Sequence, residues 1–177
     1  MTRFVVVLPI EPLVVNAEFT VAQWPLHVTL VEPFETDVEV DTLDAALAPV
    51  AAATRPIPAD VAEDAMFGPR RNILVSLVRD DGDALPALRA VAMTALRERA
   101  VDLGHTRTDY RPHVTAKGHG RVHEGDRLLL DTMALVRLRP PETSHHGRIV
   151  GSWRMGEAAG EAAGASVAEA DARRPAT

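Results

Sequence analysis

The amino-acid sequence predicts an α+β fold in which two similar lobes face each other across a central cleft. Three observations lead to this prediction. Short β-rich segments alternate with two segments of helical periodicity along the chain. Two of the β-rich segments are nearly the same, LHVTL at residues 26–30 and PHVTA at residues 112–116. With 177 residues, 46% of them hydrophobic, the chain is long enough for one domain with a substantial core.

The N-terminal part of the chain is predicted to be mostly strand. The apolar run at residues 3–10 forms a first strand and is far too short to cross a bilayer. Residues 11–25 hold two prolines among scattered polar residues, which predicts a loop with a short helical turn over one lobe. Residues 26–31 form the strand of the first motif, and Pro33 is expected to end it.

Two helices are predicted from apolar residues at helical spacing. An apolar stripe and a following Arg-Pro pair mark an amphipathic helix over residues 40–53. The stronger stripe runs over residues 85–103, and Gly104 is expected to close that helix in the usual C-terminal position. The second motif follows this helix, so each lobe combines strands, a helix and one motif.

The remaining strands are predicted from shorter patterns. Residues 57–67 are weakly patterned and are interpreted as an irregular strand. A turn at Gly68-Pro69 leads into a clear strand at residues 72–78. Residues 127–139 and 147–155 are expected to form a final pair of strands joined through a Pro-Pro pair.

The chain is expected to divide into one two-lobed domain, residues 1–156, and a tail, residues 157–177. The tail is rich in Ala, Gly and Glu and has a single large apolar residue, so it is predicted to be disordered. No tandem repeat of the whole sequence is visible. The two motifs are therefore the main sign that the lobes are related by pseudo-symmetry.

Composition limits the classes of partner. The formal net charge is -6, which weighs against tight binding to long nucleic acid, because that affinity comes mainly from cationic side chains. A small anionic substrate in a locally positive cleft remains compatible with this charge. The chain has no cysteine, so disulfides and thiolate zinc sites are excluded. We expect a cytoplasmic, monomeric protein with no membrane partner.

The motifs carry the residue types that a two-histidine phosphate site needs. Side chains alternate across a strand, so the histidine and threonine of each motif share one face. The valine between them points the other way, into a core. Imidazole titrates near neutrality, so one ring can remove a proton while the other donates one. The candidate catalytic residues are His27, Thr29, His113 and Thr115.

The paired motifs give the chain a specific resemblance. Two His-x-Thr motifs at this spacing, the second within YRPHVT, resemble those of the two-histidine (2H) phosphoesterase superfamily. The nearest group is the 2'-5' RNA ligase-like and cyclic nucleotide phosphodiesterase group, and the resemblance covers about residues 3–155. It implies antiparallel sheets with helices on the outside. Ala116 departs from the bulkier apolar residue common after the second threonine, and the first lobe is short.

The resemblance also implies a mechanism. His27 and His113 would contact the substrate phosphate from the two sides of the cleft, as general acid and general base. Thr29 and Thr115 would donate hydrogen bonds to the non-bridging oxygens, where negative charge accumulates. Which histidine is the acid cannot be assigned from the sequence, and no metal is required. A histidine and a threonine on one strand often have only a structural role, with their polar atoms hydrogen-bonded to neighbours. To explain this chain, that structural role would have to arise independently in both motifs.

Four further residues are candidates for substrate binding. Lys117 and Arg70 could supply positive charge to the phosphate, although ordinary surface charges explain them as well. Trp24 and Tyr110 precede the two motifs and could stack on a base, or simply pack. The other histidines match no standard zinc spacing and are interpreted as surface or loop residues: His105, His119, His123, His145 and His146.

The favoured function is a metal-independent, cofactor-free phosphodiesterase. Its substrate would be a small nucleotide or an RNA end carrying a 2',3'-cyclic phosphate, a 2'-5' linkage or a cyclic nucleotide diester. Two alternatives stay open: a module that binds nucleotides or RNA ends without turnover, and an RNA 2'-5' ligase. No Gly-rich phosphate loop is visible, so ligation driven by ATP has no support in the sequence.

Overall fold

The computed structural model describes residues 1–104, 108–138 and 146–156. The strands are β1 (Thr2–Pro9), β2 (Glu18–Thr20), β3 (His27–Thr36), β4 (Ile57–Phe67), β5 (Ile73–Asp80), β6 (His113–Thr115), β7 (Arg127–Leu130), β8 (Thr132–Leu138) and β9 (His146–Arg154). The helices are the 3-10 turn η1 (Val21–Gln23) and the α-helices α1 (Val40–Ala53) and α2 (Ala84–Arg97). The predicted tail, residues 157–177, lies outside the described residues, as do His105, Pro140, Pro141 and His145.

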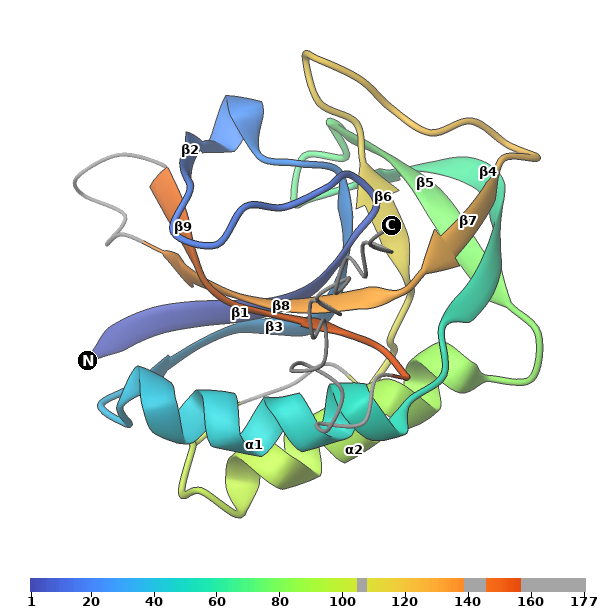
Figure 1. Cartoon of the computed structure of the whole chain (residues 1–177). Helices are drawn as coiled ribbons and strands as arrows, with labels where there is room; N and C mark the ends of the chain where they lie inside the picture. Colours follow the sequence, from blue (N-terminus) through green and yellow to red (C-terminus); the bar gives the residue numbers. More distant parts are fainter. Residues whose placement is uncertain (105–107, 139–145, 157–177) are drawn as a thin grey trace, which may run out of the picture.

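The described strands form one antiparallel sheet of nine strands in the order β2-β9-β8-β1-β3-β6-β5-β4-β7. The sheet curls, and α1 and α2 lie together against its outer face (Figure 1). The α+β fold with antiparallel strands and helices on the outside is therefore confirmed. The two predicted lobes are the two arms of a single continuous sheet, which meet where β3 lies beside β6.

The main core fills the space between the sheet and the helices. Leu43 and Leu47 of α1 and Leu85 and Leu96 of α2 are fully buried against the apolar face of the central strands. Val28 and Val114 are 0% and 1% exposed and belong to this core. The prediction that the motif valines point inward is confirmed, and the histidines and threonines must then face the opposite side of the sheet.

A second, smaller core covers part of the inner face of the sheet. Val5, Val7 and Ile149 pack there against Phe19, which lies on the segment that carries β2 and η1. Phe19 reaches the sheet because Gly147 leaves room for it: a Cβ at position 147 would lie 2.6 Å from the ring. The predicted loop over one lobe thus covers the arm that contains β8 and β9, and β2 is a short strand that the sequence did not reveal.

Two predicted element ends differ from the structure. Helix α2 ends at Arg97, before the expected Gly104, because Ala100 has a φ of 60° and the N–H of Val101 returns to the carbonyl of Leu96. Strand β3 continues through Pro33 to Thr36. Pro33 lies beside an irregularity in the pairing with β1, where no ladder hydrogen bond from its nitrogen is required.

The predicted strand at residues 127–139 is two strands. The break falls at Asp131: β7 pairs with β4 at one edge of the sheet, whereas β8 pairs with β1 in the other arm. The helix at residues 40–53 and the strand at residues 57–67 have the predicted bounds. No α-helix in the described ranges is both long and apolar enough to cross a membrane.

Candidate active site

The two motif strands lie side by side at the junction of the arms. β3 and β6 are antiparallel and pair at Val28 and Val114. Continuing this register places Thr115 beside His27 and His113 beside Thr29. The four candidate side chains therefore form a two-by-two arrangement on the inner face of the sheet, with each histidine next to the threonine of the other motif.

Both histidine rings are held in the same way. The Nδ1 atom of His27 lies 2.7 Å from the carbonyl oxygen of Pro25, and Nδ1 of His113 lies 2.8 Å from the carbonyl oxygen of Arg111. A carbonyl oxygen can only accept, so Nδ1 donates in each case. Nε2 is then the ring nitrogen that can exchange a proton with a bound molecule. In both motifs the carbonyl belongs to the residue two positions before the histidine.

An aromatic side chain flanks each histidine. The Trp24 ring lies 4.6 Å from the His27 ring, centroid to centroid, and in turn packs 5.3 Å from Phe19. The Phe67 ring meets His113 edge-on at 4.7 Å. These contacts restrict the rotation of both imidazoles. Trp24 therefore packs against a motif histidine as well as against the second core.

A cation lies over each of these aromatic rings. The Lys117 ammonium is 5.9 Å from the Trp24 centroid, and the Arg111 guanidinium is 5.0 Å from the Phe67 centroid. Both distances fit cation–π contacts. Lys117 is half-buried, and this burial lowers the pKa of its ammonium below the usual value. Positive charge thus flanks the four motif side chains from both sides.

The two histidines differ in their surroundings. Burial lowers the pKa of His27 from 6.5 to about 4, and the nearby charges of Lys117 and His113 act in the same direction. The hydrogen bond to the Pro25 carbonyl opposes this shift without reversing it. His27 is consequently neutral near pH 7, with Nε2 able to accept a proton.

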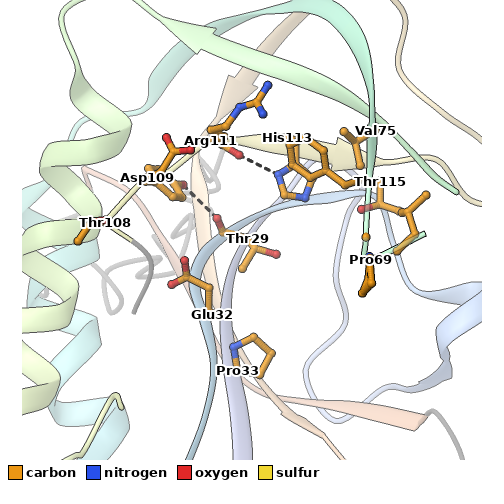
Figure 2. Close-up of a pocket in the computed structure, with 14 residues that line it drawn as sticks. Thr29, Glu32, Pro33, Pro69, Val75, Thr108, Asp109, Arg111, His113 and Thr115 are labelled. Carbon is orange, nitrogen blue, oxygen red and sulfur yellow. Dashed lines mark hydrogen bonds between the residues drawn. The ribbon is translucent and has the colours of Figure 1, made fainter. Parts of the chain in front are cut away.

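A cavity of about 980 Å³ opens beside His113. Figure 2 shows His113, Thr115 and Thr29 around one end of it, with Glu32 and Pro33 farther along β3. Its wall includes Thr29, Glu32, Pro33, Phe67, Gly68, Pro69, Ile73, Val75, Thr108, Asp109, Tyr110, Arg111, His113 and Thr115. His27 does not line it. The cavity extends over β5, on the arm opposite the one that Phe19 and Trp24 cover.

Of the other predicted binding residues, only Tyr110 lines the cavity. Its hydroxyl donates a hydrogen bond to the Thr29 carbonyl oxygen at 3.0 Å. Arg70 is exposed on the turn after β4 and does not line the cavity, although its neighbours Gly68 and Pro69 do. Lys117 lies on the His27 side.

Sequence reasoning missed three residues of the site: Glu32, Phe67 and Arg111. Arg111 directly precedes PHVT, and this position beside the motif was the available signal. Phe67 ends a strand whose pattern is weak, so only the fold brings it to His113. Both carboxylate oxygens of Glu32 accept hydrogen bonds from Nη2 of Arg89, at 2.9 and 2.7 Å, and this pair joins β3 to α2.

Two of the other described histidines, His119 and His123, make local contacts. The Nδ1 atom of His119 lies 3.2 Å from the Ala22 carbonyl oxygen, and its Nε2 lies 3.5 Å from a Glu11 carboxylate oxygen. His123 is exposed, with Nδ1 3.9 Å from an Asp126 carboxylate oxygen. In the described part of the chain, no three His, Asp or Glu side chains gather in a way that could hold a metal ion.

Comparison with known proteins identifies the family. A family model described as the 2'-5' RNA ligase superfamily matches residues 8–139, a span that includes both motifs. The chain belongs to the 2'-5' RNA ligase superfamily. The resemblance to the two-histidine phosphoesterases is thereby confirmed. No curated protein sequence matches the chain significantly.

Solved structures similar to this superfamily member share its fold. The protein TT0787 of Thermus thermophilus superposes with a TM-score of 0.57 at 14% identity, covering 87% of this chain and 98% of that one. Escherichia coli LigT complexed with 3'-AMP gives a TM-score of 0.57 at 13% identity, with the same shares of the two chains. A structure described as a phosphoesterase gives 0.57 at 15% identity, covering 88% and 99%. At these identities the likeness establishes the fold.

Proposed function

We propose that this protein is a metal-independent phosphodiesterase that hydrolyses small nucleotides or RNA ends. One observation carries the proposal. Two imidazoles on adjacent strands are each turned by a backbone carbonyl two residues earlier, and each lies next to a threonine. The substrates would carry a 2',3'-cyclic phosphate, a 2'-5' linkage or a cyclic nucleotide diester. LigT has been crystallised with 3'-AMP and with phosphate, which supports a small phosphate ligand for the shared fold.

His27 acts as the general base in the proposed reaction. Its depressed pKa leaves Nε2 neutral at physiological pH, so it can take a proton from water. The water oxygen forms a new bond to phosphorus as the bond from phosphorus to a ribose oxygen breaks. His113 enters the step protonated and gives its proton to the departing oxygen. The products are a phosphomonoester and a free ribose hydroxyl. His27 is left protonated and His113 neutral, and both exchange protons with solvent before the next turnover.

The threonines and the flanking cations stabilise the transition state. Thr29 and Thr115 donate hydrogen bonds to the non-bridging phosphoryl oxygens, whose negative charge grows during the step. Lys117 and Arg111 add positive potential from opposite sides. Because these groups supply both proton transfer and charge stabilisation, the mechanism proceeds without a metal ion or a nucleotide cofactor.

The nucleoside part of the substrate occupies the cavity beside His113. A volume of about 980 Å³ is sufficient for a nucleotide. The apolar wall contributed by Phe67, Pro69 and Ile73 suits a base and sugar. This placement puts the departing ribose oxygen next to His113 and leaves the phosphorus within reach of His27. It agrees with the division of roles inferred from the pKa of His27.

Ligation is the reverse of the same step and uses the same residues. The family description includes ligases, so joining of RNA ends is the second candidate function. We favour hydrolysis because water is abundant and the acidic chain offers little positive surface for two RNA ends. We also propose that the protein is monomeric and cytoplasmic.

A product-resolved chromatographic assay tests the proposal. Wild type, His113→Ala and His123→Ala are incubated in EDTA with 2',3'-cyclic mononucleotides, 2'-5' and 3'-5' dinucleotides, and cyclic dinucleotides. We expect cleavage of at least one substrate class by wild type and His123→Ala, and a loss of about 10²- to 10⁴-fold in His113→Ala. Equal activity of all three proteins would refute the two-histidine assignment. Binding without turnover by wild type would favour the non-catalytic module.

A further inference from the structure

The junction that assembles the four motif side chains is the narrowest among the described strands. β3 and β6 pair at a single position, Val28 with Val114. By contrast, β3 pairs with β1 at seven positions, and β6 pairs with β5 at three. The geometry between the two motifs therefore depends on contacts other than the strand ladder, because one pair does not fix the separation and tilt of two strands.

The Tyr110 side chain supplies such a contact. Its hydroxyl donates to the Thr29 carbonyl oxygen at 3.0 Å, across 81 positions in the sequence. Tyr110 immediately precedes Arg111, whose carbonyl oxygen accepts the hydrogen bond from Nδ1 of His113. One hydroxyl thus links the backbone of Thr29 to the backbone that orients His113. In Figure 2 one dashed line ends on Thr29 and another joins Arg111 to His113.

The Tyr110 ring is itself held from helix α2. The Arg89 guanidinium lies 4.8 Å from the ring centroid, and its Nη2 donates to both oxygens of Glu32 at 2.9 and 2.7 Å. Glu32 is three residues beyond Thr29 on the same strand. Thr29, Tyr110, Arg89 and Glu32 therefore form a closed ring of contacts that begins and ends on β3. Arg89 is buried, whereas Glu32 also lines the cavity.

We propose that Tyr110 is a positioning residue that sets the distance between the two motifs, and that Arg89 fixes Tyr110 in place. This inference rests on the proposed function, because it concerns the geometry that phosphodiester hydrolysis requires. Tyr110 need not touch the reacting phosphate. Its hydroxyl acts through Thr29 and through the backbone that orients His113.

Tyr110→Phe removes the hydroxyl and keeps the ring under Arg89. We expect kcat toward the cleaved probe of the substrate panel to fall about 10- to 100-fold, since small misplacements of catalytic groups cost about that much. KM should stay within about twofold, because the variant keeps the aromatic ring that Tyr110 contributes to the cavity wall. Arg89→Lys, which keeps a cation near the ring, should show a smaller loss of kcat in the same direction.

Trp153→Phe provides the matched control. It also deletes one aromatic donor, the Nε1 that bonds to Asp44 at 3.0 Å between β9 and α1. A general loss of stability would affect both variants, whereas a positioning role predicts loss of kcat in Tyr110→Phe alone. Unchanged kcat in Tyr110→Phe would overturn the inference.

Amide hydrogen exchange tests the same inference without a substrate. In Tyr110→Phe the amides of Val114 and Thr115 should exchange faster, while those of β1 and β8 stay as in wild type and Trp153→Phe shows no change at β6. If wild type cleaves no probe, the proposed function fails, and this experiment still decides the positioning role. Unchanged exchange at β6 would refute it. If Tyr110→Phe does not fold, Arg89→Lys is measured in its place with the same outcomes.

Discussion

The environment of His27 predicts a specific dependence of stability on pH. Its pKa is about 4 in the folded protein and 6.5 in the unfolded chain. Between these values the unfolded chain binds a proton that the folded protein resists, so acid favours unfolding. His27 therefore adds stability that is fully present above pH 6.5 and is lost as the pH falls toward 4.

The magnitude follows from the two pKa values. The shift from 6.5 to about 4 corresponds to about 3 kcal/mol of stability, of which about 2 to 3 kcal/mol is lost between pH 7 and pH 4.5. His27→Asn removes the titration and keeps an amide nitrogen near the position of Nδ1, where it can still donate to the Pro25 carbonyl oxygen. Stability of this variant should thus decline less in acid than that of wild type.

Urea unfolding at pH 7 and pH 4.5 measures the effect. The carboxylates titrate equally in wild type and variant, so the difference between the two proteins isolates His27. We expect the acid-induced loss of unfolding free energy to be about 2 to 3 kcal/mol smaller in His27→Asn. His123→Asn, at a histidine whose side chain is 68% exposed, should parallel wild type. Parallel behaviour of His27→Asn and wild type would refute the burial argument.

Three further predictions test the site and the core. Thr29→Val and Thr115→Val should each lower kcat by about 10²- to 10³-fold in steady-state assays, because each removes one donor to the phosphoryl oxygens; a loss confined to KM would contradict this role. Since His27 must be neutral to act as base, the acidic limb of the kcat/KM profile should lie near pH 4, and a limb near pH 6.5 would contradict its burial. Leu47→Ala, at a fully buried position of α1, should lower the unfolding free energy by about 2 to 5 kcal/mol in urea titrations. A change below about 1 kcal/mol would show that the Leu47 side chain is not tightly packed in the core.

Local sequence patterns predicted most of the helices and strands. The helix at residues 40–53 and the strand at residues 57–67 have the predicted bounds because periodicity and the flanking turn residues agree there. Helix α2 ends before the predicted residue 103, and the reason lies in the packing of the residues that follow it. Val101 and Leu103 extend the apolar stripe in the sequence, but in the structure they enter the core from non-helical backbone after Ala100 turns left-handed.

The repeat of the His-x-Thr motif predicted which residues meet, but it could not predict how they differ. Alternation along a strand places each histidine beside a threonine and each valine in the core, and this requires no knowledge of distant contacts. Phe67, Glu32 and Arg111 reach the site through strand pairing and loop packing. Arg111 alone had a local signal, its place beside the second motif. Phe67 meets His113 and Glu32 meets Arg89 across long stretches of sequence, and no local pattern marks such contacts.

The unequal covering of the two arms turns a symmetric motif pair into an asymmetric site. Residues that follow the first strand place Phe19 and Trp24 on one arm and leave His27 half-buried beneath an indole. The other arm has no such cover in the described part of the chain, and the cavity opens there beside His113. Burial keeps the first imidazole neutral, while the cavity lies open beside the second. In the proposed reaction, two nearly identical pentapeptides would perform opposite proton transfers, and the cover supplied by the segment between residues 11 and 25 would make His27 the base.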